Sequence, residues 1–130
     1  MMQTSIRKET AFSGVGLHTG CDVKVRLLPA EQDSGVRFIR KDLPGFPIIK
    51  AEGSNVVNTN YATTLGAGGV TVSTVEHILA ALYGLGVDNV DIEVYGSEIP
   101  ILDGSAGEFI KKIEAAGLIY LMAEREYLVV

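Results

Sequence analysis

The chain is poor in cysteine and has no long hydrophobic run. Cys21 is the only cysteine among 130 residues, so no internal disulfide can form, which is typical of proteins in a reducing compartment. No apolar run is long enough to span a bilayer, and residues 1–9 lack the apolar core of a signal peptide. These absences favour a cytoplasmic protein without a transmembrane segment.

The chain also lacks a basic patch, a low-complexity tract and a repeat of fixed period. Its net charge is −5, and acidic and basic residues are interspersed, which disfavours binding to a nucleic-acid backbone. Hydrophobic residues make up 47% of the sequence, which argues against disorder. The length predicts a single domain that is large enough to bury a core.

One stretch, residues 73–86, carries helix signals at both ends. Ser73 and Glu76 stand at the spacing of a capping box, and Gly84 and Gly86 are suited to end the helix. Apolar residues recur between them at helical spacing: Val75, Ile78, Leu79 and Leu82. We therefore expect an amphipathic helix with one face on the core.

Most of the remaining segments favour short strands. Residues 3–12 are expected to be extended, and residues 22–27 and 89–94 alternate polar and apolar side chains. The glycines of residues 66–69 predict a hairpin. Residues 126–130 predict a last strand.

A second helix is expected near the end of the chain. Ser105 and Glu108 repeat the capping-box spacing, and Gly117 is placed to end the helix. Runs of strands with two helices between them indicate an α+β fold. We expect a mainly antiparallel sheet with both helices packed on one face.

Glu76 and His77 lie side by side in the first predicted helix, and residue types alone leave their role open. Glu76 either completes the capping box or acts as a general base. His77 is either structural or a metal ligand. The chain has two histidines and no cysteine pair, whereas catalytic zinc needs three protein ligands. Spacing alone therefore gives only weak support for a metal site.

Residues 14–20 bring glycines together in a way that resembles a phosphate-binding loop. The stretch lacks the lysine of a Walker motif and does not open a helix pattern. The simpler interpretation is the turn of a β-hairpin that continues into residues 22–27.

Four stretches, in this order, resemble one family: residues 14–20, 71–82, 88–94 and 98–106. They are similar to the first half of the UDP-3-O-acyl-N-acetylglucosamine deacetylases, the zinc hydrolases of lipid A biosynthesis. The resemblance covers essentially the whole chain. It implies the first of two similar α+β domains, with the active site between them. Residues 1–126 would form this domain and residues 127–130 would begin the connection to the second.

The resemblance also assigns roles to single residues. It implies that His77 is a zinc ligand and that Glu76 is the general base. It places Leu17 and His18 on a turn that borders the active site. It also matches Asn60, Tyr61 and Ala62 to a segment that lines the substrate cleft.

The chain departs from the family pattern in one respect. The family's other two zinc ligands, a histidine and an aspartate, belong to a second-domain motif that this sequence lacks. The resemblance therefore implies weak zinc binding and no activity for this chain alone. Its expected partners are the UDP-linked acylated glucosamine substrate and the C-terminal domain of the same protein. The alternative is a non-catalytic truncated module that only mediates protein association, and we expect self-association through a patch beside His77.

Overall fold

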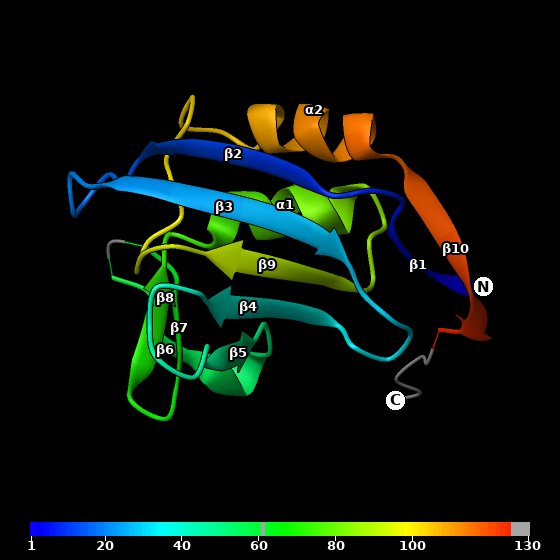
Figure 1. Cartoon of the computed structure of the whole chain (residues 1–130), viewed down its shortest axis with the longest axis horizontal. Coiled ribbons are helices and arrows are strands. Elements are labelled where there is room, and N and C mark those ends of the chain that lie inside the picture. The colour runs from blue at the N-terminus through cyan, green and yellow to red at the C-terminus, as the bar shows by residue number, and fades with distance from the viewer. Residues whose placement is uncertain (61, 126–130) are drawn as a thin grey trace.

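A five-stranded sheet forms the centre of the computed structural model, which describes residues 1–60 and 62–125 (Figure 1). Its strands lie in the order β2-β3-β9-β4-β5. Neighbouring strands are antiparallel except for β4 and β9, which are parallel. The bounds are Thr10–Val15 for β2, Asp22–Pro29 for β3, Val36–Arg40 for β4, Ile48–Lys50 for β5 and Val90–Val94 for β9.

Two smaller sheets flank the central one. The first pairs β1 with β10, and the second has the order β6-β7-β8. The bounds are Met2–Ile6 for β1, Val56–Asn58 for β6, Thr64–Ala67 for β7, Val70–Ser73 for β8 and Leu118–Glu124 for β10. A short 3-10 helix, η1, spans Gly53–Asn55. The two α-helices are α1 (Glu76–Gly84) and α2 (Gly107–Ala116).

The helices cover one face of the central sheet; in Figure 1, α1 lies behind β3 and β9, and α2 lies above β2. Alternate residues of the central strands point to this side and are buried, among them Val25, Leu27, Phe38 and Ile92. The buried faces of α1 and α2 complete the core, with Ile78, Leu82, Phe109 and Ile113 fully buried. The prediction of a mainly antiparallel α+β fold with both helices on one face is confirmed.

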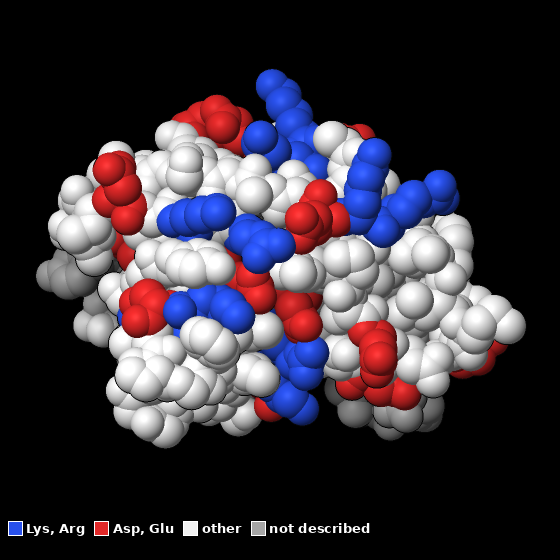
Figure 2. Space-filling view, in the orientation of Figure 1, with Lys and Arg blue, Asp and Glu red and all other residues white. Residues whose placement is uncertain are grey.

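The opposite face of the sheet is charged, as Figure 2 shows. Arg26 and Glu93 lie opposite each other on β3 and β9 and form an ion pair of 3.1 Å. Arg37 on β4 binds both carboxylate oxygens of Asp91, its partner in register on β9. Opposite charges at paired positions are favourable across strands, so this face is suited to solvent.

Some predicted elements are confirmed and others are wrong. The β2–β3 hairpin and the β7–β8 hairpin are present, and positive φ angles at Gly68 and Gly69 turn the second one. The predicted strand over residues 3–12 is instead two strands in different sheets, β1 and β2. Strand β10 was not predicted. The strand predicted over residues 126–130 lies outside the described residues, as does the proposed domain boundary.

Both predicted capping boxes are wrong. In α2 the residue at the N-cap position is Ala106, which makes no side-chain cap hydrogen bond. Ser105 instead accepts a hydrogen bond from the Gly107 amide and donates its hydroxyl to Asp103. The predicted helix end at Gly117 is confirmed, with a φ of 78°.

The described part of the chain contains no helix long and apolar enough to cross a membrane. This finding does not test the predicted cytoplasmic location, which stays a prediction.

Phe109 joins α2 to β2, and its removal should destabilise the fold. The side chain is fully buried, and its ring meets Phe12 edge-on with ring centroids 5.1 Å apart. Phe109→Ala should lower the free energy of unfolding by about 3–5 kcal/mol, because a cavity adds to the lost burial. Urea unfolding measures this. Tyr120→Ala, at a side chain 68% exposed, is the control and should change little. Equal losses in the two variants would contradict this packing.

Candidate functional site

Helix α1 begins at Glu76, two residues later than a cap at Ser73 predicts. Ser73 is still the last residue of β8, and its hydroxyl donates to the carbonyl oxygen of Ser97 at 3.3 Å. Thr74 then takes a φ of 61°, which reverses the chain before Val75 and the helix. Ser73 therefore cannot cap α1, because its backbone is already committed to the sheet. As a result, Glu76 is free of the capping role.

The Glu76 carboxylate is held on one side only. Its Oε2 accepts a hydrogen bond of 3.0 Å from the Thr63 amide, and the Val75 amide donates back to the Thr63 carbonyl at 3.3 Å. Its Oε1 is buried and has no hydrogen-bond partner among the described residues. A buried carboxylate oxygen without a partner is costly in a protein, so this atom is suited to bind a ligand or water.

His77 follows on the first turn of α1 and is half-buried. Its imidazole makes no hydrogen bond with a described residue. Across residues 1–60 and 62–125, no group of three or more His, Cys, Asp or Glu side chains could hold a metal ion. The chemistry of His77 fits a single metal ligand, but the described residues do not supply the three that catalytic zinc requires.

The glycine turn, residues 16–21, connects β2 to β3. Most of its backbone amides are already used: Gly16 donates to the Cys21 carbonyl at 2.9 Å, and Gly20 donates to the Gly16 carbonyl at 3.0 Å. The His18 and Thr19 amides both donate to the carboxylate of Glu98. These amides are not available to a phosphate group, which supports the interpretation as a hairpin turn.

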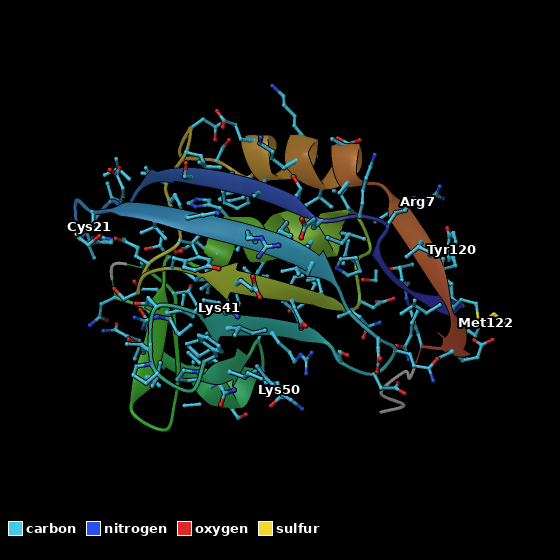
Figure 3. All side chains as sticks on the ribbon, in the orientation of Figure 1. Arg7, Cys21, Lys41, Lys50, Tyr120 and Met122 are labelled. Carbon is cyan, nitrogen blue, oxygen red and sulfur yellow. The ribbon has the colours of Figure 1, made fainter. Side chains whose placement is uncertain are left out.

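The predicted residues of this turn lie at the surface. Leu17 is 56% exposed and His18 is also exposed. Cys21 marks the same end of the β2–β3 hairpin in Figure 3, at the opposite end of the molecule from Tyr120 and Met122 on β10. The exposed apolar side chains of β10 are thus distant from this turn.

Glu98 is a residue that sequence reasoning missed. It is fully buried, and its Oε2 also accepts a hydrogen bond of 2.9 Å from the Thr74 hydroxyl. Burial alone would raise the pKa of this carboxyl, but the hydrogen bonds from Thr19, His18 and Thr74 outweigh burial and lower the pKa. The sequence signal was slight: an acidic residue directly before the apolar run Ile99-Pro100-Ile101.

The segment predicted to line a substrate cleft reaches α1 through its neighbour. Ala62 directly precedes Thr63, which binds both Glu76 and Val75. Asn60 is exposed, and its amide donates to the Asn58 side chain at 2.8 Å. Tyr61 lies outside the described residues. The structure therefore brings Ala62 close to Glu76, whereas Asn60 makes no hydrogen bond to α1.

The start of α1 is thus joined to two loops. Thr63 holds it to residues 58–63, and Glu98 joins Thr74 to the glycine turn. Of the predicted residues, Glu76, His77 and Ala62 share one neighbourhood. His18 is connected to it through Glu98.

Comparisons with known proteins identify relatives of the whole chain. A family model described as UDP-3-O-acyl N-acetylglycosamine deacetylase matches residues 3–130. The chain is 46% identical over 130 residues to a UDP-3-O-acyl-N-acetylglucosamine deacetylase of Citrifermentans bemidjiense, with all of this chain and 43% of the relative covered. It is 51% identical over 119 residues to one of Trichormus variabilis, with 92% and 42% covered. The chain spans less than half the length of these relatives.

Glu98 should make stability depend on pH. Its pKa in the folded chain lies below the ordinary value of 4.5, so its contribution is present above about pH 4.5 and is lost as pH falls through the folded pKa. The loss in unfolding free energy caused by Glu98→Gln should therefore shrink between pH 7 and pH 3. Urea unfolding of both proteins across this range measures it. Glu114→Gln, on the exposed side of α2, is the control, and an equal pH response in both variants would contradict the prediction.

Proposed function

Because the chain belongs to the UDP-3-O-acyl N-acetylglycosamine deacetylase family, we propose that it is the N-terminal part of a lipid A deacetylase. The complete enzyme would remove the N-acetyl group from UDP-3-O-acyl-N-acetylglucosamine. The observation that carries the proposal is the buried Oε1 of Glu76, which has no partner among the described residues and lies beside His77 at the start of α1. The chain spans about 43% of its relatives, so this activity is proposed for the longer protein.

His77 would supply one ligand to a catalytic zinc ion. Its imidazole has no described protein partner, and histidine is a common zinc ligand. The other two ligands would come from the rest of the protein, because the described residues form no three-residue cluster. Bound zinc would acidify a water molecule and polarise the carbonyl of the scissile amide.

Glu76 would be the general base that takes a proton from the attacking water. Within the described part of the chain no donor contacts its Oε1, whereas Oε2 is held by the Thr63 amide. Because one oxygen of the carboxylate is held, the other oxygen keeps a fixed direction, and little reorientation of the side chain is needed when the proton is transferred. The water would add to the acetyl carbonyl carbon as Glu76 takes one of its protons. The C–N bond would then break as a proton passes to the leaving nitrogen, so that acetate and the free amine are the products.

The substrate would lie along the two loops that meet α1. Leu17 and His18 offer an exposed apolar and an imidazole side chain on the glycine turn. Asn60, Tyr61 and Ala62, next to Thr63, would line the substrate cleft from the other loop. Thr63 joins this set because it positions Glu76 and directly follows Ala62.

A non-catalytic role in protein association remains the second candidate. Tyr120 and Met122 on β10 are 68% and 89% exposed and would suit a protein contact. They lie at the other end of the molecule from Cys21 in the glycine turn (Figure 3). Glu98 joins this turn to the start of α1, so the β10 surface differs from the predicted patch beside His77. Self-association stays a prediction.

Replacing Glu76 should abolish most of the activity without unfolding the site. In the complete enzyme, Glu76→Gln should lower kcat by roughly two to four orders of magnitude, the usual contribution of a general base. The amide oxygen of glutamine can still accept from Thr63, so the local fold is kept. Deacetylation of the UDP-linked substrate measures this, with Glu114→Gln as the control. Wild-type activity in Glu76→Gln would refute the role of Glu76.

The isolated chain should bind zinc weakly and show no deacetylase activity, because it supplies one of three ligands. Zinc titration of residues 1–130 against a chelating dye, with the complete enzyme beside it, measures this difference. His77→Ala in the complete enzyme should lower its zinc content. Tight zinc binding by the isolated chain, unchanged by His77→Ala, would contradict the assignment.

A further inference from the structure

The carboxylate of Glu98 is a buried group shared by two segments of the candidate site. Its Oε1 accepts from the Thr19 amide at 3.0 Å, and both oxygens receive the His18 amide at 3.1–3.2 Å. Its Oε2 accepts from the Thr74 hydroxyl, between β8 and α1. One charged group thus joins the turn that carries Leu17 to the start of the helix.

Amide and hydroxyl donors, rather than a cation, stabilise the negative charge of the Glu98 carboxylate. Within the described chain, no Lys or Arg forms a salt bridge with Glu98. Hydrogen bonds to an ionised carboxylate are stronger than neutral ones and require good geometry. The amides of the turn must therefore keep their orientation as long as Glu98 stays ionised.

The backbone on both sides is adapted to this contact. A Cβ atom at Gly16 would lie 2.3 Å from Oε1 of Glu98 and 2.6 Å from Oγ1 of Thr19, so only glycine fits. Thr74 adopts a φ of 61°, which is costly for a β-branched residue and is retained because surrounding contacts hold it. Both backbone restrictions, the need for glycine at residue 16 and the positive φ of Thr74, occur at residues that contact the same carboxylate.

Resting on the deacetylase function proposed above, we propose that Glu98 is a positioning residue for that reaction. Through the His18 and Thr19 amides it holds the substrate-facing turn, and through Thr74 it holds the approach to Glu76. Its action is indirect, because the carboxylate is buried and its oxygens are occupied by protein donors. It keeps the two sides of the site at a fixed separation.

The first test is Glu98→Gln in the complete enzyme. The glutamine nitrogen cannot accept from a backbone amide, so the turn loses part of its support. We expect kcat/KM to fall about 10- to 100-fold, mainly through a higher KM, with zinc content unchanged. Wild-type kcat and KM in a folded Glu98→Gln enzyme would overturn the proposal.

Two further variants separate the two sides of the contact. Thr74→Val keeps the branched shape but removes the hydroxyl, and should lower kcat while KM stays near that of the wild type. Gly16→Ala should displace Oε1 and raise KM as Glu98→Gln does. Combining Gly16→Ala with Glu98→Gln should add little, because both remove the same contact. Fully additive losses in the double variant would overturn the proposal. If Glu98→Gln does not fold, the kinetic changes in Thr74→Val and Gly16→Ala test the proposal without it.

A stability control distinguishes positioning from general destabilisation. Ile113→Val in the core of α2 lowers stability without touching the site and should leave kcat and KM unchanged. An equal change of KM in Ile113→Val would overturn the proposal. If the wild-type enzyme itself has no deacetylase activity, both the proposed function and this inference are refuted. An active wild type with an unaffected Glu98→Gln variant overturns the inference alone.

Discussion

A carboxylate buried without a cation must take its hydrogen bonds from backbone amides and hydroxyl groups, and Glu98 does so where three segments meet. The bridge between Ser73 and Glu98 brings the loop after β9 beside the end of β8. From there, Glu98 reaches the amides of His18 and Thr19 on one side and the Thr74 hydroxyl on the other. Losing these acceptors would leave the buried Thr74 hydroxyl and two part-buried amides unpaired, which is costlier than losing an exposed contact. The link between the glycine turn and the start of α1 therefore depends on this one group.

The place where α1 begins decides what Glu76 can do. Had the helix begun after Ser73, Glu76 would have been the reciprocal partner of a capping box. The sheet instead retains Ser73, and the positive φ of Thr74 delays the helix until Glu76 itself. Thr63 then takes over the task of holding the carboxylate. A local sequence signal was overridden by a tertiary contact, and one carboxylate oxygen of Glu76 is left without a partner among residues 1–60 and 62–125.

Local patterns predicted much of the fold. Alternation over residues 89–94 and the glycines at 66–69 correctly indicated β9 and the β7–β8 hairpin. Pairings between distant segments had no such signal, because partner strands need not share a pattern. The β1–β10 ribbon joins the two ends of the described chain, and the parallel contact of β4 with β9 spans six intervening elements. The site followed the same division: Glu76 and His77 stood out as neighbours, whereas Thr63 and Glu98 became visible only through contacts in space.

The two carboxylates near α1 differ in how fully their oxygens are used, and this difference separates their roles. Both oxygens of Glu98 accept protein hydrogen bonds, so a proton added there would displace a donor. Glu76 has one oxygen held by Thr63 and one buried oxygen without a described partner. A base needs an unused lone pair with a fixed direction, and only Glu76 offers this combination of the two. The occupied carboxylate is thereby suited to hold the site together, and the half-occupied one to move a proton.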